Sequence, residues 1–289
     1  MPSIRYDAES FHSQFGPWAL VAGASDGIGE SFARRLAAAG INLILLARRE
    51  ALLEEVADRL RSEFEIETRI IVADLTGPDL DQRVARGVEG LEVGMLVYNA
   101  GAIHGAKAFH DHPVEQALGL VDLNCRGPVL LAHRLGGPMR ERGRGGILLL
   151  TSMAGLSGSS YTATYAATKS FDLILAESLW HELRPSGVDV MAVVAGATKT
   201  PSMLNSNEGF ADYPNVMEPE DVARGALANL GGGPVWVAGA HNRAAAAGIL
   251  PIPRTALING MSEATAQLYD LPFVRAFGEE FSELTDGEG

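Results

Sequence analysis

The chain has 289 residues, of which 47% are hydrophobic and 20% are charged, and its formal net charge is −13. This length and composition predict one large or two small α/β domains and exclude a largely disordered chain. The negative charge disfavours nucleic acid and anionic membranes as partners. Cys125 is the sole cysteine, so an intrachain disulfide is excluded.

The N-terminal stretch MPSIRYDAESFHSQFG is mixed polar and lacks the apolar core of a secretory signal. No run of about 18 or more apolar residues occurs, so we expect no membrane span. No Cys/His cluster has the spacing of a zinc site. We therefore predict a cytoplasmic protein without a metal site.

Strand-like apolar runs alternate with helix-like stretches along most of the chain. Residues 18–24 form the first predicted strand, which runs into glycines and a helix over 29–39. The other predicted strands are 41–48, 68–75, 95–101, 145–152, 188–196 and 233–239; the other main helices are 50–64, about 114–135 and 165–183. Glycines at 136–137, 143–146 and 231–233 predict loops.

Strands that are apolar on both faces and alternate with helices favour a parallel sheet covered on both sides. No internal repeat or linker divides the chain. We therefore predict a single doubly wound α/β domain over 1–289 with a seven-stranded, mainly parallel sheet. Its core would span about 16–240, followed by a C-terminal helical extension over about 241–280. Ligands of such folds bind at the carboxyl ends of the strands.

The stretch GASDGIG lies between the first predicted strand and the first helix. Glycines there let the backbone approach a diphosphate, and the helix N-terminus offers free N–H groups to it. A tight turn without a ligand is the alternative. The context favours a dinucleotide site of the Rossmann type, formed by Gly23, Ser25, Asp26, Gly27, Ile28 and Gly29.

The second strand ends in LLARRE, with Arg48 at its tip and no acidic residue before Glu50. In dinucleotide-binding folds an acidic residue here binds the ribose 2′-hydroxyl, whereas an arginine accommodates a 2′-phosphate. The pattern favours NADP(H) over NAD(H). A solvated arginine at a helix start is the alternative.

Two further strand ends carry residues suited to the same ligand. VADL places Asp74 and Leu75 on the predicted adenine side, and YNAG places Asn99, Ala100 and Gly101 where small residues leave room for a ribose or nicotinamide. Each signal is weak alone, because strand ends often carry such residues for turns.

A set of polar residues follows in the second half of the chain. Ser152 ends the fifth predicted strand, Tyr165 comes thirteen residues later, and Lys169 lies one helical turn beyond it. Asn124 lies inside a predicted helix, which is an unfavourable place for asparagine unless its amide has a task. By themselves Tyr165 and Lys169 are either a proton-transfer pair or a surface tyrosine beside a solvated lysine.

Together, the glycine loop, NAG, the mid-helix Asn, the Ser and Tyr-x-x-x-Lys resemble the classical short-chain dehydrogenase/reductase family over roughly 18–239. The stretches ALVAGASDGIGESFARRLAAAGINLILLARRE, FEIETRIIVADL and LEVGMLVYNAG are most similar to its branch of 17β-hydroxysteroid dehydrogenases and 3-ketoacyl-CoA reductases. Three positions depart from the family pattern: Ala22 replaces threonine, Tyr98 replaces the first asparagine of Asn-Asn-Ala-Gly, and Ala195 replaces a proline.

The resemblance implies a role for each catalytic position. Tyr165 would be the general acid toward a carbonyl, Lys169 would favour the phenolate and bind the nicotinamide ribose, and Ser152 would hold the substrate oxygen. Asn124 would support a water and proton path to Lys169. The cofactor site would be completed by Gly196, Thr198 and Thr200, which remain in AGATKT.

Candidate substrate contacts are His104, Ser152, Met153, Tyr161, Tyr165 and Leu204. The segment 202–217 fits either a mobile lid with apolar side chains or a variable surface loop. His110 and His112 lack a third ligand at metal spacing, so we expect a solvent-exposed loop there. The resemblance also implies a homodimer or homotetramer.

The sequence therefore predicts an NADP(H)-dependent oxidoreductase that interconverts a ketone and a secondary alcohol, with a lipophilic substrate such as a steroid or an acyl chain. The alternatives are a non-catalytic NADP-binding regulator, a family member acting on another small carbonyl compound, and a related enoyl reductase or sugar epimerase.

Overall fold

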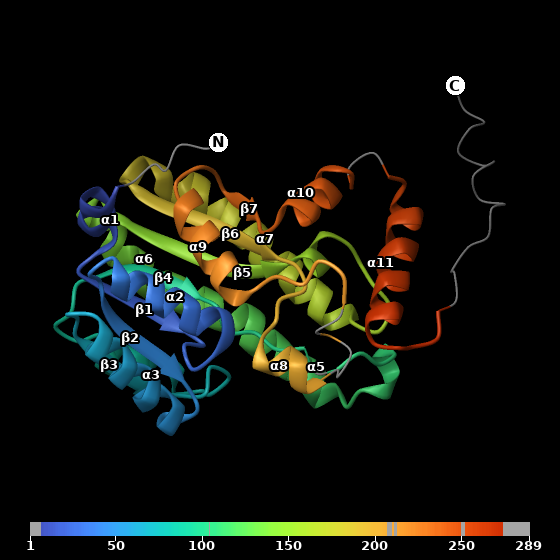
Figure 1. The fold of residues 1–289 in the computed structure, drawn as a ribbon, viewed down its shortest axis with the longest axis horizontal. Coiled ribbons are helices and arrows are strands. Elements are labelled where there is room, and N and C mark those ends of the chain that lie inside the picture. Colours follow the sequence, from blue (N-terminus) through green and yellow to red (C-terminus); the bar gives the residue numbers. More distant parts are fainter. Residues whose placement is uncertain (1–6, 104, 207–209, 211–212, 250–251, 274–289) are drawn as a thin grey trace.

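Seven strands form one sheet in which every neighbouring pair is parallel (Figure 1). Their order is β3-β2-β1-β4-β5-β6-β7, so the direction of winding reverses between β1 and β4. The strands are β1 (Trp18–Ala22), β2 (Asn42–Ala47), β3 (Thr68–Val72), β4 (Val93–Tyr98), β5 (Gly145–Ser152), β6 (Val188–Ala195) and β7 (Val235–Val237). The predicted doubly wound fold is confirmed, and the reversal marks the place where such sheets bind ligands.

The structure is a computed structural model that describes residues 7–103, 105–206, 210, 213–249 and 252–273. His104 and parts of the segment 202–217 therefore lie outside the described residues. The prediction that this segment is a mobile lid stays a prediction.

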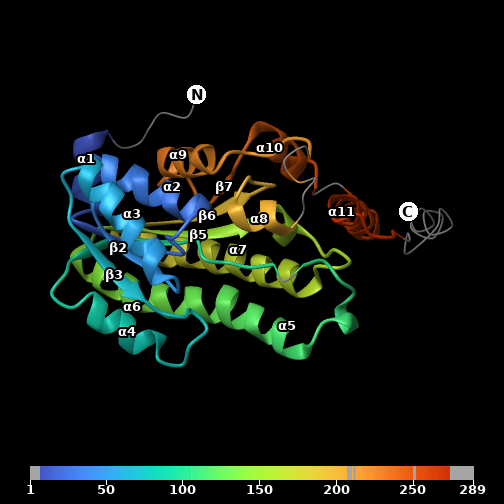
Figure 2. The same cartoon turned by 60° about the horizontal axis from the view of Figure 1, so that its bottom comes forward.

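Helices cover both faces of the sheet (Figure 2). On one face, Phe32 and Leu36 belong to the same buried core as Leu43 of β2. On the other face, Leu131 shares a core with Leu20 of β1. The first layer consists of α2 (Gly27–Ala38), α3 (Glu50–Glu63) and α9 (Pro219–Asn229), and the second of α4 (Leu80–Gly87), α6 (Gly127–Arg142) and α7 (Ala163–Leu183). Burial on both sides explains why the strands are apolar throughout.

The loop predicted at Gly136–Gly137 is wrong, because both glycines lie inside α6. A Cβ on Gly136 would lie 3.3 Å from Ile147 Cδ1, so the missing side chain lets the helix pack closely on β5. The helix ends instead at Gly143, which has the left-handed conformation of a C-cap. Gly145 and Gly146 fall in both the predicted loop 143–146 and the predicted strand 145–152, and the structure places them in β5.

Helix α1 (Ala8–Phe15) was not predicted from the polar N-terminal stretch. Asp7 caps it by accepting a hydrogen bond of 2.8 Å from the backbone N–H of Ser10. Phe15 is fully buried, and a Cβ on Gly146 would lie 2.8 Å from its ring. Phe11, one turn earlier, packs against the same core, and its ring centroid lies 4.8 Å from that of Phe15. Tertiary packing of these two aromatic side chains therefore stabilises the short helix.

The remaining helices gather beyond one end of the sheet in both views (Figures 1 and 2). They are α5 (Val114–Val121), α8 (Pro201–Ser206), α10 (Ala240–Ala247) and α11 (Arg254–Leu268), with short 3-10 turns at Phe109–Asp111 and Met153–Leu156. A further 3-10 turn, Arg184–Ser186, precedes β6 at the opposite, amino end of the strands. The division into a core and a C-terminal extension stays a prediction, as does the cytoplasmic location. No helix in the described part of the chain has the length and apolar character needed to cross a membrane.

Candidate active site

The glycine loop, Gly23–Gly29, connects β1 to α2. Gly23 and Gly27 have φ values of +82° and +57°, a region that favours glycine. A Cβ on Gly29 would overlap the carbonyl oxygen of Gly23 and lie 2.6 Å from Asn99 Nδ2. The loop therefore folds tightly onto the end of β4, and α2 begins directly at its last turn. The first N–H groups of a helix have no partners within that helix and attract anions.

The tip of β2 carries two exposed arginines with different surroundings. Arg49 donates a hydrogen bond of 2.9 Å to Ser25 Oγ and forms an ion pair with Asp26, both in the glycine loop. The pKa of the Asp74 carboxyl is lowered mainly by the hydrogen bond from the Thr76 backbone N–H, and in smaller part by the positive charge of the nearby Arg48. The sequence singled out Arg48 alone, and a repeated arginine at the strand tip was the signal for Arg49.

At the tip of β3, Asp74 Oδ1 accepts hydrogen bonds from the backbone and the hydroxyl of Thr76, at 2.9 and 2.8 Å. Leu75 is buried in the core against the α4 side of the sheet. Asp74 is exposed at the carboxyl edge of the sheet, where it is open to a ligand, whereas Leu75 is mainly a core residue.

The tip of β4 contacts the glycine loop directly. Asn99 Nδ2 donates a hydrogen bond of 3.1 Å to the Gly23 carbonyl, and a Cβ on Gly23 would lie 2.9 Å from the backbone of Ala100. Gly101 is exposed. Asn99, Ala100 and Gly101 thus bring the β1 and β4 ends together, on the two sides of the winding reversal.

Asn124 lies on a π-helical turn, Asp122–Arg126, inserted between α5 and α6. Single π turns of this kind are frequent at functional sites. The buried Tyr98 hydroxyl donates a hydrogen bond of 2.6 Å to the Leu123 carbonyl within this turn. A Cβ on Gly127 would overlap that hydroxyl, so the glycine admits the tyrosine. The departure at Tyr98 therefore anchors the turn that carries Asn124.

The Asn124 side chain is fully buried and faces α7. Its Nδ2 donates a hydrogen bond of 3.0 Å to Thr168 Oγ1, while its Oδ1 has no hydrogen-bond partner among the described residues. Buried polar atoms are nearly always paired, so an unpaired amide oxygen indicates a place for a ligand or water.

Lys169 is buried on α7 and donates two hydrogen bonds. Its Nζ lies 2.7 Å from the Leu150 carbonyl and 3.0 Å from Asp172 Oδ2. An ammonium group has three N–H donors, so one remains for a further partner. Asp172 was missed from the sequence. We call Tyr98, Asn124, Cys125, Lys169 and Asp172 the Lys169 cluster.

Burial is the main cause of the pKa shifts in the Lys169 cluster. It raises the pKa of Asp172 to about 6, although Lys169 lowers it in part. The pKa of Cys125 is raised to about 11 by burial and by the Asp172 charge. Tyr98 also has a raised pKa for the same two reasons. These shifts keep Cys125 protonated at neutral pH and exclude it as a thiolate nucleophile.

Ser152 ends β5 and begins the 3-10 turn that follows it, where its Oγ accepts a hydrogen bond of 3.2 Å from the Ala154 N–H. Thr151 Oγ1 donates a hydrogen bond of 2.6 Å to the Lys169 carbonyl. This contact fastens α7 to the carboxyl end of β5. Tyr165 lies on the same helix, one turn before Lys169 and half-buried.

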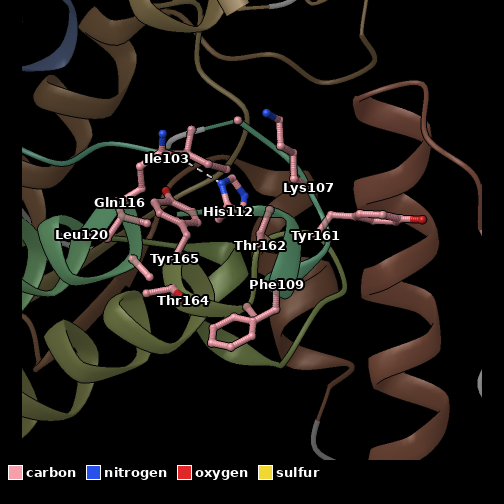
Figure 3. Close-up of a pocket in the computed structure, with 13 residues that line it drawn as sticks. Ile103, Lys107, Phe109, His112, Gln116, Leu120, Tyr161, Thr162, Thr164 and Tyr165 are labelled. Carbon is pink, nitrogen blue, oxygen red and sulfur yellow. Dashed lines mark hydrogen bonds between the residues drawn. The ribbon is translucent and has the colours of Figure 1, made fainter. Parts of the chain in front are cut away.

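A cavity of about 380 Å³, including space open to solvent, lies beside Tyr165 (Figure 3). Its walls include Ile103, Phe109, His112, Gln116, Leu120 and Tyr165. His112 is half-buried, and its Nδ1 lies 3.2 Å from Gln116 Oε1. His110 is exposed, as the sequence predicted, whereas His112 is half-buried and lines the cavity. No residue spacing in the sequence indicated that His112 would line a cavity.

Only some of the candidate substrate contacts line the cavity beside Tyr165. Tyr161 lines the cavity, has a φ of +65°, and points toward α11 (Figure 3). Its hydroxyl donates a hydrogen bond to the Pro272 carbonyl, just beyond the end of that helix. Ser152, Met153 and Leu204 are not among the residues that line this cavity. Phe210 is fully buried, whereas Leu204 is exposed.

The loop after β6 lies between the glycine loop and the C-terminal helices. Thr198 Oγ1 donates a hydrogen bond of 2.9 Å to the Gly196 carbonyl, and a Cβ on Gly27 would lie 3.1 Å from Thr200 Cγ2. A Cβ on Gly196 would overlap the Asn242 side chain of α10. Thr200 is therefore next to the glycine loop, and Gly196 permits the close approach of α10.

Helix α11 is fastened to the segment that precedes Tyr165. The Ser160 N–H donates a hydrogen bond of 2.9 Å to Ser262 Oγ, and Ser159 Oγ lies 2.7 Å from Thr265 Oγ1. Burial, and next the nearby Tyr165, raise the pKa of Tyr269 to about 12. The C-terminal end of α11 thus comes close to Tyr165.

These residues fit a nicotinamide dinucleotide. The glycine loop gives a diphosphate close access to backbone N–H groups at the start of α2. Lys169 Nζ and Asn124 Oδ1 lie 3.3 and 3.5 Å from the position a Cβ would take on Gly101, so both polar groups face open backbone at this edge. A donor and an unpaired acceptor suit the hydroxyl groups of a ribose. Within the described residues, no three His, Cys, Asp or Glu side chains gather as metal ligands.

Comparisons with known proteins agree with this geometry. Residues 17–210 match the family described as short chain dehydrogenase. The chain is 30% identical over 238 residues to a 7beta-hydroxysteroid dehydrogenase of Collinsella aerofaciens, covering 81% of this chain and 90% of that protein. It is 35% identical over 234 residues to a very-long-chain 3-oxoacyl-CoA reductase-like protein of Arabidopsis thaliana, covering 77% and 74%.

Solved structures are similar over most of their length. A 7beta-hydroxysteroid dehydrogenase superposes with a TM-score of 0.82 at 28% identity, covering 87% of this chain and 98% of that one. A short-chain dehydrogenase from Sphingobium yanoikuyae in complex with NADPH gives a TM-score of 0.71 at 29% identity, covering 91% and 99%.

Proposed function

We propose, from the premise that this chain belongs to the short-chain dehydrogenase family, that it is an NADP(H)-dependent enzyme interconverting a ketone and a secondary alcohol. Membership makes it an oxidoreductase of a fold that binds a nicotinamide cofactor. The observation that carries the proposal is the arrangement of α7: Tyr165 faces a cavity, while Lys169, one turn on, faces Gly101 at the cofactor edge.

The side chains would divide the work on a bound carbonyl. When bound, the nicotinamide cofactor supplies or accepts the hydride. The Tyr165 hydroxyl would donate its proton to the carbonyl oxygen, and the Ser152 hydroxyl would donate a hydrogen bond to the same oxygen. The Lys169 ammonium would stabilise the phenolate that remains. Asn124 Oδ1, unpaired in the structure, would accept a hydrogen bond from a water or hydroxyl beside Lys169.

The preference for NADP(H) rests on the tip of β2. Arg48 is exposed and is not hydrogen-bonded to the glycine loop, so its guanidinium is available to a 2′-phosphate, whereas Arg49 already contacts Ser25 and Asp26. Guanidinium groups bind phosphates in bidentate geometry. The complex of a similar short-chain dehydrogenase with NADPH supports this preference.

The substrate is proposed to be a lipophilic ketone. Ile103, Phe109 and Leu120 give the cavity beside Tyr165 an apolar wall, with His112 and Gln116 as its polar groups. Similar proteins are named for a hydroxysteroid and for a very-long-chain 3-oxoacyl-CoA. A steroid skeleton is mostly apolar, and a very-long-chain 3-oxoacyl thioester carries its ketone on a long apolar acyl chain.

A substrate panel followed at the nicotinamide absorbance band tests the proposal. The panel contains a ketosteroid, a long-chain 3-ketoacyl thioester, a small aliphatic ketone and an enoyl thioester, each with NADPH and NADH. We expect turnover with a lipophilic ketone and faster turnover with NADPH. Cofactor binding without any turnover would favour the regulator, and turnover of the enoyl thioester alone would favour an enoyl reductase.

We also propose a homodimer or homotetramer. An exposed apolar stripe, Val114, Leu118 and Val121, runs along α5, and Phe171 and Ile174 are exposed on α7. Contiguous apolar surface of this kind is typical of subunit contacts. Native mass spectrometry at micromolar concentration should give a multiple of 30.6 kDa, and a monomer mass would contradict this.

A further inference from the structure

The buried face of α7 carries two charged residues where a helix against a sheet normally carries apolar ones. Its buried residues are Ala166, Thr168, Lys169, Asp172 and Ala176. Lys169 has a role in the proposed reaction. Asp172, three residues on, has no role in that mechanism, and yet its side chain is only 1% exposed. The question is why a carboxylate is kept in this place.

Asp172 is only partly satisfied by its neighbours. Oδ2 accepts the hydrogen bond of 3.0 Å from Lys169 Nζ, but Oδ1 has no partner among the described residues. The titratable groups that face it from other elements are Tyr98 of β4 and Cys125 of the π turn, and both are neutral at pH 7 because burial raises the pKa of each. Lys169 is therefore the one cation identified beside it in the described part of the chain.

Packing and hydrogen bonding alone do not account for an acid at this position. A buried ion pair is often no more stable than apolar residues of the same volume. The Leu150 carbonyl already accepts a hydrogen bond from Lys169 Nζ, so the ammonium has a neutral partner without Asp172. What only an acid adds is a negative charge close to the ammonium.

We propose that Asp172 is a positioning residue for the reaction: its carboxylate holds Lys169 Nζ at the Gly101 edge and offsets part of the ammonium charge. This inference rests on the proposed function. Lys169 favours the phenolate of Tyr165 through its positive charge, so a carboxylate on its far side weakens that effect. Asp172 thereby sets how strongly the Lys169 ammonium favours the phenolate in the proposed reaction.

The expected size of the effect follows from the helix geometry. Asp172 lies seven residues beyond Tyr165, or about 10 Å along the axis. At an effective dielectric constant of about 20, one elementary charge at that distance moves a proton equilibrium by about one pH unit. Other titratable groups near Tyr165 are Tyr269, directly after α11, and Lys107, His112 and Tyr161 around the cavity. No hydrogen bond or ion pair joins any of them to Asp172 among the described residues, so a change at Asp172 leaves their own contributions unchanged.

The test is the pH profile of ketone reduction by the full chain carrying Asp172→Asn. The amide keeps an oxygen that can accept from Lys169 but removes the charge. Reduction needs the protonated phenol, so turnover declines as the pH rises past a midpoint. We expect that midpoint to move about one unit lower in D172N. The matched control is Asp189→Asn, which neutralises another buried acid. Asp189 lies at the amino end of β6, away from the carboxyl edge of the sheet that carries the site, so this variant should leave the midpoint unchanged.

Further variants keep the outcome decisive. His112→Gln in both backgrounds removes the imidazole's own titration from the profile. If D172N does not fold, Asp172→Ser is the second neutral variant, with the same expected shift. An unchanged midpoint with lower turnover at every pH would overturn the proposal in favour of a purely structural role, as would failure of both neutral variants to fold. A wild-type chain that turns over no carbonyl substrate would overturn the proposed function and this inference with it.

Discussion

The glycine loop and the Lys169 cluster lie at the same edge of the sheet and serve the same proposed cofactor by opposite means. The glycine loop works by lacking side chains: at Gly29 even a Cβ would overlap the Gly23 carbonyl. The Lys169 cluster works through buried charged and polar side chains, with Lys169 between Leu150 and Asp172. The proposed cofactor would thus be held by exposed backbone on one side and by a buried ammonium charge on the other.

The two regions should therefore be sensitive to different kinds of substitution. The glycine loop depends on sterics, so its failure should be local and independent of pH. The Lys169 cluster depends on charges taken out of water, so it should respond to pH and to the loss of a single partner. The following variants separate these two kinds of dependence.

Breaking the glycine loop should have the largest effect on cofactor binding. In Gly29→Ala the new methyl group displaces α2 from Gly23 and Asn99, and we expect cofactor affinity to fall by about 100-fold or more, with about 1–3 kcal/mol lost in the free energy of unfolding. NADPH fluorescence titration and urea unfolding measure the two. The matched control is Gly137→Ala in α6, where no atom lies within 4 Å of the added Cβ. Equal NADPH affinity in the two variants would contradict the steric account.

Breaking the Lys169 cluster should cost more folding stability than Gly29→Ala does. Asp172→Leu leaves the Lys169 ammonium buried without a counterion, and we expect a loss of about 3–5 kcal/mol in the free energy of unfolding. The double variant Asp172→Leu/Lys169→Met removes both charges and should recover most of that loss. Urea unfolding of the four proteins in the cycle gives the coupling energy. Additive effects would show that the two residues do not act as a pair.

Reversing the charge at the β2 tip tests the proposed phosphate contact beside the glycine loop. Arg48→Asp places a carboxylate where a 2′-phosphate is proposed to bind, and should lower the ratio of kcat/KM for NADPH to that for NADH by about tenfold or more. Arg49→Ala should change this ratio less, because that guanidinium already contacts Ser25 and Asp26. A larger change in R49A than in R48D would contradict the proposal and assign the phosphate contact to Arg49.

The smallest effect is a pH dependence of stability on the cluster side. Because the pKa of Asp172 is raised from 3.8 to about 6, the folded state binds its proton more tightly than the unfolded state does. The contribution of this group to stability is therefore largest below pH 4 and falls as the pH rises toward 6, by on the order of 1 kcal/mol per unit. Urea unfolding measures the free energy of unfolding of the wild type and of D172N from pH 4 to 7. The wild-type value minus the D172N value should fall as the pH rises. A flat difference would mean that burial leaves the Asp172 carboxyl unperturbed.

The parts predicted from the sequence are those set by backbone constraints. Buried parallel strands require apolar runs, and the loop onto Gly29 tolerates only glycine, so both leave a periodic or positional pattern in the letters. The same logic failed at Gly136, because a glycine that permits close helix packing looks like a glycine that ends a helix. Sequence spacing does not separate these two uses.

The parts that were missed depend on contacts between distant segments. The roles of His112 and Arg49 arise only when loops after different strands fold together. Asp172 had a signal, since it lies three residues after Lys169 on one helix face, but an acid beside a lysine is usually a solvated surface pair. Its burial comes from β4 and the π turn, which the sequence does not place next to α7.

The proposed role of Tyr165 as proton donor is tested by measuring turnover and cofactor binding of Tyr165→Phe, with the best ketone of the panel and NADPH. We expect a loss of turnover on the order of 100- to 10,000-fold, because the variant lacks the proton donor. NADPH affinity, measured by fluorescence titration, should stay within about twofold of wild type, since the cradle around Gly23 and Gly101 is unchanged. Turnover close to the wild-type rate in Y165F would contradict the account.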